Sequence, residues 1–289
     1  MIGGRDRSLR LGVLLICALA AGCGGSAGGQ ASVVPPSAHA TPAGPANPVG
    51  LIAMGHSGLT GEGTSAEGGA NYAGSWATGT MPDVNSVYLR LVAVRPETKE
   101  RVANKAVGGA RAAELRTQAT AALGEVPVPA LAIIQTVDQD IQCEPDDADA
   151  VAASVAEALQ AIHTASPNTK ILVVGQAGRP SATFIQALVA AHPDVKADMM
   201  GDDPCAFYKP DGTLNEAGIA KLTASIDTYE AAVAKACAAV PGCVTDGGVR
   251  RSWVDRLELF SADLNHLDVQ GQAAVAEQLW PVVETLLGL

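Results

Sequence analysis

The sequence predicts an α/β fold, a three-layer α/β/α sandwich around a mainly parallel five-stranded sheet. From residue 49 onward, short apolar runs alternate with longer segments that have helical spacing. The apolar runs are continuous, which is typical of parallel strands buried on both faces. Glycines and polar residues follow directly after several of these runs. Parallel sheets carry their chemistry beyond the carboxyl ends of the strands, so these positions are the first candidates for a functional site.

Each expected strand is a short run of Val, Ile, Leu and Ala, and each expected helix has apolar residues at three- and four-residue spacing. In chain order, strands and following helices are 49–54 with 81–94, 100–107 with 109–123, 129–137 with 147–165, and 170–176 with 181–192; a long helix at 215–239, a fifth strand at 243–248 and a last helix at 269–288 follow. Strands separated by helices imply a parallel sheet that is covered on both faces. We expect one domain, residues 49–289.

The N-terminus is typical of an export signal. Residues 1–22 combine three arginines with an apolar run that is short for a membrane span. The run ends in small residues directly before Cys23, which resembles a bacterial lipobox with lipidation of that cysteine. The Gly/Ala/Pro-rich residues 23–48 are expected to be a flexible tether. We therefore expect a cell-membrane lipoprotein on the outer face or a secreted protein; an ordinary signal peptide cut nearby is the alternative.

Charge and cysteine content limit the partners. The formal net charge is −11, which disfavours binding to nucleic acid or to anionic lipid headgroups. The membrane is therefore expected as a partner only through the N-terminal lipid anchor. Four cysteines of the domain form an even set in an exported chain, which favours disulfides; they are Cys143, Cys205, Cys237 and Cys243. Pairing Cys237 with Cys243 closes a tight loop and leaves the other two, although three pairings are possible. Their spacing fits no zinc pattern.

Two short motifs could carry chemistry. Ser57 follows the first strand in a glycine-rich turn, "GHSGLTG". Asp263 and His266 stand three residues apart before the last helix, where the carboxylate can orient the imidazole as a base. Taken alone, the serine can be a helix cap, and the Asp-x-x-His spacing can be a cap with a surface histidine.

Together, four motifs in order resemble the SGNH/GDSL hydrolase family, as a bacterial exported, lipoprotein-like member. They are "GHSGLTG" (55–61), "NKAVGGA" (104–110), "QTVDQDI" (135–141) and "DLNH" (263–266). The resemblance covers the whole domain and implies a flavodoxin-like sheet. Two positions depart from the family pattern: His56 replaces the usual aspartate, and Gln139 stands where the family has asparagine.

The resemblance implies a serine hydrolase acting on carboxylic esters, an esterase or lipase, through an acyl-enzyme. Ser57 would be the nucleophile, His266 the base and Asp263 the acid of the triad. The N–H groups of Ser57 and Gly109, with the Gln139 amide, would form the oxyanion hole. The substrate would be a small-molecule, glycan or lipid ester. No cofactor and no metal are expected.

The alternative is a catalytically weak or inactive binding or structural lipoprotein on a hydrolase fold, since fold does not fix function. The two departures, His56 and Gln139, are what a decayed site could show. Asp138 and Asp140 could also be a solvated pair or a calcium-like cluster with Asp146 and Asp147, although the spacing lacks the order of an EF-hand loop.

Overall fold

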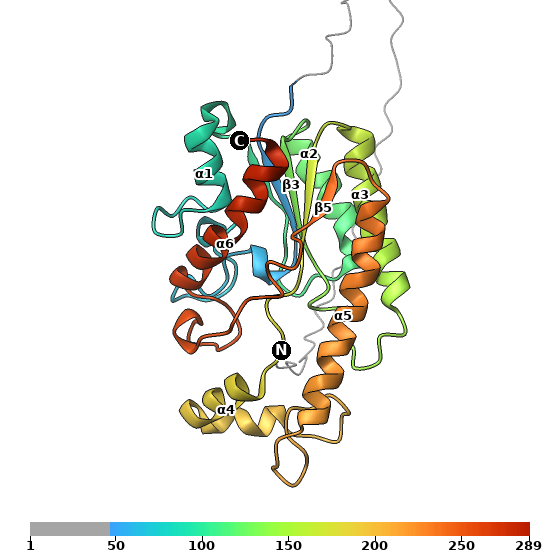
Figure 1. Ribbon diagram of the computed structural model, residues 1–289. Helices are drawn as coiled ribbons and strands as arrows, with labels where there is room; N and C mark the ends of the chain where they lie inside the picture. The colour runs from blue at the N-terminus through green and yellow to red at the C-terminus, as the bar shows by residue number, and fades with distance from the viewer. Residues whose placement is uncertain (1–46) are drawn as a thin grey trace, which may run out of the picture. The chain divides into compact units, whose positions relative to one another are not determined.

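The computed structural model describes residues 47–289. The predicted signal peptide, Cys23 and the tether up to residue 46 lie outside the described residues. Five strands form one fully parallel sheet in the order β2–β1–β3–β4–β5, which confirms the predicted fold class (Figure 1). The strands are β1 (Leu51–Gly55), β2 (Val102–Asn104), β3 (Leu131–Gln135), β4 (Lys170–Val174) and β5 (Cys243–Thr245).

Helices cover both faces of the sheet (Figure 1). They are α1 (Val87–Val94), α2 (Leu115–Glu125), α3 (Ala148–Ala165), α4 (Ala182–Ala191), α5 (Glu216–Ala238) and α6 (Val269–Leu287). The expected helix 81–94 was too long at its start. Asn85 has a positive φ of 45°, and the Ser86 side chain accepts from the Leu89 N–H, so the helix begins only after this cap. No helix within residues 47–289 is long and apolar enough to cross a membrane.

The core consists of two apolar layers, one on each face of the sheet. In β1, Ile52 and Met54 pack toward the layer of α2, α3 and α5, whereas Leu51 and Ala53 pack toward the layer of α1 and α6. This alternation follows from the two-residue period of a strand. The continuous apolar runs of the sequence are therefore needed to fill both layers.

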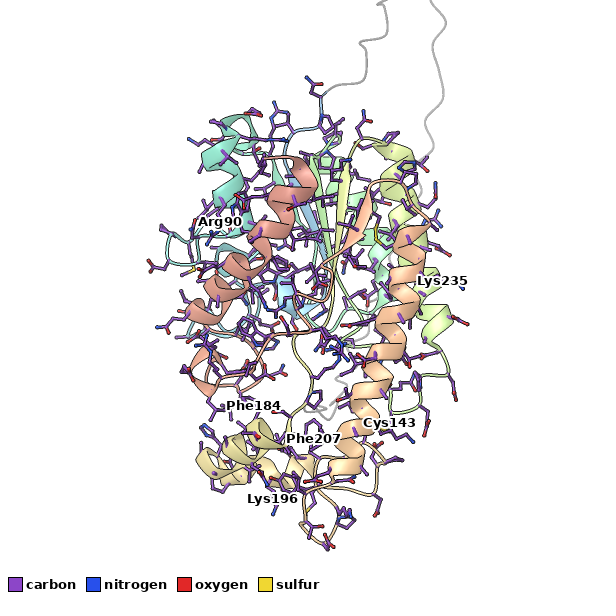
Figure 2. The ribbon with its side chains drawn as sticks, viewed as in Figure 1. Arg90, Cys143, Phe184, Lys196, Phe207 and Lys235 are labelled. Atoms are coloured by element: carbon purple, nitrogen blue, oxygen red, sulfur yellow. A yellow bond between two sulfur atoms is a disulfide. The ribbon has the colours of Figure 1, made fainter. Side chains whose placement is uncertain are left out.

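A segment between β4 and α5 extends beyond the carboxyl edge of the sheet and contains α4 (Figure 1). It has a small core of its own, in which Ile185 and Tyr208 pack against Ile219 near the start of α5. Phe184 of α4 also contacts Phe260, with ring centroids 5.6 Å apart. Figure 2 labels Phe184 and Phe207 in this segment, with Cys143 beside α5.

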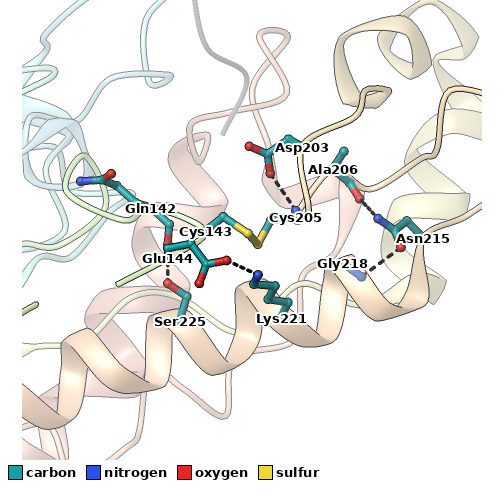
Figure 3. The surroundings of a disulfide bond; sticks show 10 residues. All are labelled: Gln142, Cys143, Glu144, Asp203, Cys205, Ala206, Asn215, Gly218, Lys221 and Ser225. Atoms are coloured by element: carbon teal, nitrogen blue, oxygen red, sulfur yellow. Dashed lines mark hydrogen bonds and ion pairs between the residues drawn. A yellow bond between two sulfur atoms is a disulfide. The ribbon is translucent and has the colours of Figure 1, made fainter. Parts of the chain in front are cut away.

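Two disulfides join the four cysteines of the domain, Cys143 with Cys205 and Cys237 with Cys243, which is the pairing favoured by the sequence. The first ties the loop after β3 to the segment that contains α4 (Figure 3). Around it, the Cys205 N–H donates to Asp203 Oδ1 at 2.7 Å, and Ser225 Oγ donates to the Gln142 carbonyl. The disulfide therefore fixes the outer segment to the loop that carries Asp138 and Gln139.

The two disulfides should differ in their effect on stability, because they close loops of very different length. The separation is 62 residues for Cys143–Cys205 and 6 residues for Cys237–Cys243. Replacing the first pair by serines should lower the free energy of unfolding by about 4 kcal/mol, and replacing the second pair by about 2 kcal/mol. Urea unfolding of the two double variants measures the difference. An equal or larger loss in the short-loop variant would contradict this account.

Candidate active site

The turn that carries Ser57 is fixed at the carboxyl end of β1. Gly55 has a φ of 146°, and a Cβ on this residue would lie 1.8 Å from the Gln135 carbonyl oxygen of β3. The buried Gln118 side chain of α2 holds both peptide groups of Gly55. Its Oε1 accepts from the Gly55 N–H at 2.7 Å, and its Nε2 donates to the Gly55 carbonyl at 3.1 Å. Only glycine fits this position, and two elements fix its orientation.

Ser57 begins a single 3₁₀ turn, Ser57–Leu59, and is buried. The carbonyls of the turn all accept hydrogen bonds. Ser57 O accepts from Thr60 Oγ1 at 2.9 Å, Gly58 O from Trp76 Nε1 at 2.9 Å, and Leu59 O from Asn104 Nδ2 at 2.8 Å. Within residues 47–289 the Ser57 N–H donates to no protein acceptor. The turn is thus held through its carbonyl groups, and the N–H beside the serine hydroxyl remains available.

Asp263 and His266 lie in a loop that Phe260 and Leu267 close through a bridge. Asp263 Oδ2 lies 2.8 Å from His266 Nδ1. Asp263 Oδ1 accepts from Ser261 Oγ and from the Asn265 and His266 N–H groups, at 2.7–2.9 Å. Burial alone would raise the pKa of Asp263, but these hydrogen bonds outweigh burial and hold the pKa well below its usual range. The carboxylate is therefore ionised and oriented toward the imidazole.

The serine segment and the histidine loop lie against each other. A Cβ on Gly63 would lie 2.7 Å from the Leu267 carbonyl oxygen and 3.0 Å from His266 Cβ, so the absence of a side chain permits this contact. Within the described residues no hydrogen bond joins Ser57 to His266. His266 Nε2 instead lies 3.6 Å from Glu62 Oε2. The structure therefore brings together the predicted acid and base and places the serine segment beside them.

Gly109 and Gln139, the two other predicted oxyanion donors, lie in different settings. Gly109 has a φ of 77° in an open turn after β2, and its N–H donates to no acceptor among the described residues. The Gln139 side chain instead donates to Asp138 Oδ2 at 3.1 Å. Val137, two residues before Gln139, is buried with a φ of 77°. This conformation costs a β-branched residue free energy, and such conformations cluster at functional sites.

Asp138 connects three strand ends, a role that sequence reasoning missed. Its Oδ1 accepts from Gln176 Nε2, after β4, at 2.9 Å. Its Oδ2 accepts from Gln139 and lies 3.7 Å from His56 Nδ1, after β1. Asp140 is buried and accepts from the Ala112 N–H at 2.9 Å; burial raises its pKa. Asp138 and Asp140 thus accept hydrogen bonds from other segments. Asp138, Asp140, Asp146 and Asp147 form no calcium-like cluster within residues 47–289.

His56 occupies a buried position that explains its difference from the family pattern. Its Nδ1 accepts from the Gly58 N–H at 3.2 Å, and its Nε2 is buried without a partner in the described structure. Burial lowers the pKa of His56, and the nearby Asp138 carboxylate opposes this effect. A neutral imidazole fits beside Asp138, whereas an aspartate at position 56 would place a buried negative charge next to the Asp138 carboxylate.

Sequence searches found no matching family model and no matching curated protein. Solved structures do match. A protein described as a GDSL-like lipase from Parabacteroides merdae superposes with a TM-score of 0.50 at 12% identity, over 84% of this chain and 98% of that chain. The fold is that of the GDSL/SGNH hydrolases.

Two further solved structures align over most of the chain with slightly lower TM-scores. An extracellular lipase from Streptomyces rimosus has a TM-score of 0.48 and 18% identity, over 82% of this chain and 99% of that chain. A family 2 carbohydrate esterase from Corynascus thermopiles has a TM-score of 0.49 and 13% identity, over 86% of this chain and 69% of that chain.

The motifs in the sequence singled out Ser57, but they did not single out Glu62 or Asp138. Glu62 follows the first motif by one residue, and no spacing rule singles out a lone acidic residue in such a loop. Asp138 precedes the Gln-Asp pair to which the third motif was matched. A useful signal for Asp138 is its position just after the end of β3, where side chains from neighbouring strands converge.

The buried, neutral His56 should make stability depend on pH. Its pKa is lower in the folded chain than the usual 6.5, so below about pH 6.5 the unfolded chain binds a proton that the folded chain does not. Stability should therefore fall as the pH drops below this value, by up to about 1.4 kcal/mol per pH unit from this one group.

Urea unfolding between pH 5 and 8 tests this prediction with His56→Gln, and with His163→Gln on α3 as the control. The dependence of the free energy of unfolding on pH should become shallower in His56→Gln and stay unchanged in His163→Gln. Identical slopes in the parent and in His56→Gln would show that His56 does not titrate differently on folding.

Proposed function

We propose that the protein is a serine hydrolase of carboxylic esters in which Ser57, His266 and Asp263 form the triad. The observation that carries the proposal is the Asp263–His266 pair at 2.8 Å, in a loop that packs on the segment beginning at Ser57. The serine comes from the start of the domain and the pair from its end, yet both lie where a parallel sheet collects functional groups.

In the proposed reaction, His266 Nε2 removes the proton from Ser57 Oγ as this oxygen attacks the ester carbonyl carbon. The imidazolium, stabilised by Asp263, then gives the proton to the departing alcohol, and an acyl-enzyme remains. Water, activated by the same nitrogen, releases the acid. Catalytic hydrogen bonds are often long in free enzymes and shorten when substrate binds, so the Ser57–His266 contact is expected to form in the complex.

The developing oxyanion would be held by the N–H groups of Ser57 and Gly109. Neither N–H donates to an acceptor among the described residues. The Gln139 Nε2 donates one hydrogen to Asp138 Oδ2 at 3.1 Å, so the second N–H of the amide would have to supply any contact with the oxyanion. Losing one oxyanion donor costs about 10²–10³ in rate, so the orientation of Gln139 should strongly affect turnover.

Labelling with a fluorophosphonate and hydrolysis of short-chain nitrophenyl esters test the proposal. We expect the parent protein to be labelled and active, and Ser57→Ala and His266→Ala to lose at least about 10³-fold in kcat/KM. His163→Ala, on α3, is the control for a histidine outside the site. Activity that survives in Ser57→Ala would contradict the assigned nucleophile.

A catalytically weak or inactive binding lipoprotein is the second candidate. It is favoured by the engagement of Gln139 with Asp138 and by the position of Glu62 beside His266 Nε2. In that case the folded parent protein would neither be labelled nor turn over esters, and the same assay decides between the two candidates.

We further propose that residues 1–22 export the chain and that Cys23 carries a lipid, with 23–48 as tether to the hydrolase domain 49–289. The even set of paired cysteines supports export, because disulfides persist in oxidising compartments. The expected substrates are small-molecule, glycan or lipid esters, and no nucleic acid partner is expected. Incorporation of labelled fatty acid into the parent protein but not into Cys23→Ser would support the anchor; equal incorporation would exclude it.

A further inference from the structure

We propose that Glu62 sets the charge preference of the site: it rejects esters whose alcohol part is anionic and accepts a hydrogen bond from a hydroxyl on a neutral alcohol. This inference rests on the proposed function and specifies its substrate class. The first ground is position. Glu62 Oε2 lies 3.6 Å from His266 Nε2, and Asp263 already occupies the other ring nitrogen.

The position matters because His266 Nε2 is the nitrogen that must give its proton to the departing alcohol. Any alcohol oxygen within hydrogen-bonding reach of that nitrogen lies only a few ångströms from the Glu62 carboxylate. Gly108 forms part of the surroundings, since a Cβ there would lie 3.2 Å from Glu62 Oε2. Glu62 therefore lies between the histidine and the turn that carries Gly109.

The second ground is that the charge of Glu62 is poorly compensated. Its Oε2 receives a weak hydrogen bond from Thr60 Oγ1, at 3.4 Å, and its Oε1 accepts from no protein donor among residues 47–289. No lysine or arginine in this part of the chain forms an ion pair with it. Asp263, in contrast, accepts from several donors. Glu62 thus has a free oxygen that can accept a hydrogen bond from substrate.

The third ground is the adjoining surface. An open groove of about 760 Å³ begins at Gly63 and runs along the start of α6. Its charged lining consists of Asp83, Glu258, Asp268, Glu277 and Arg256. The single cation of this lining lies 3.8 Å from Glu258, so it offers little free positive charge. None of Ser57, Glu62 and His266 lines this groove, but its acidic surface adds negative charge beside Gly63, the residue after Glu62.

These features favour a neutral, hydroxyl-bearing alcohol over a carboxylate or phosphate. A carboxylate is a strong acceptor for hydroxyl donors, and it repels a like charge that is only partly screened by water. With a side chain 22% exposed, Glu62 is accessible to substrate and yet shielded enough for this repulsion to matter. Polyhydroxylated alcohols such as sugars or glycerol fit this chemistry, and phosphate-bearing alcohols do not.

Three acetate esters of matched size test the inference: 2-hydroxyethyl acetate, propyl acetate and O-acetylglycolate, which are a neutral donor, a neutral non-donor and an anion. The parent should prefer them in that order by kcat/KM. In Glu62→Gln the value for O-acetylglycolate should rise about tenfold relative to propyl acetate, which corresponds to about 1.4 kcal/mol. Glu67→Gln removes the same charge from an exposed position of the same segment and should leave the ratio unchanged.

Labelling of Ser57 by a neutral fluorophosphonate, run in parallel, separates the possible failures. A parent that is neither labelled nor active overturns the proposed function and this inference with it. An active, labelled parent whose ratio is unchanged in Glu62→Gln overturns the inference alone. The inference is also overturned if Glu67→Gln raises the ratio as much as Glu62→Gln does. It is overturned as well if Glu62→Gln lowers kcat/KM equally for all three esters, because Glu62 would then act on His266 rather than on substrate.

Discussion

The candidate site depends on how the end of β1 is held. Gly55 lies so close to the Gln135 carbonyl that no side chain fits, and Gln118 bonds both of its peptide groups from within the core. Because these contacts are buried, their hydrogen bonds are costly to leave unmade. They fix the direction in which the chain leaves the sheet, and hence the place of the Ser57 turn two residues later.

From this fixed point, polar groups around the turn divide into two sets. The carbonyls of Ser57, Gly58 and Leu59 all accept hydrogen bonds, from Thr60, Trp76 and Asn104. The N–H groups of Ser57 and Gly109 have no acceptor among the described residues. A region that satisfies its acceptors and leaves donors free is suited to a developing negative charge. Negative charge is concentrated instead near His266, at Asp263 and Glu62, where it disfavours anionic alcohols in the proposed reaction.

The fold was predictable because the apolar runs and helical spacings agree with one another along the whole domain. Ser57, Asp263 and His266 were predictable as candidates because their motifs are local. The engagement of Gln139 with Asp138 was not predictable, since it depends on Val137 adopting a positive φ and on Gln176 arriving from the next strand. The role of Glu62 was hidden for a similar reason: its contact with His266 joins residues 204 positions apart in the chain.

The most direct test of the central claim is a crystal structure of the protein after reaction with a neutral fluorophosphonate. The account predicts a covalent bond from phosphorus to Ser57 Oγ, with a phosphonyl oxygen accepting from the N–H groups of Ser57 and Gly109 and His266 Nε2 within hydrogen-bonding distance of Ser57 Oγ. An adduct on another residue, or one on Ser57 with its oxygen pointing away from both N–H groups, would contradict it.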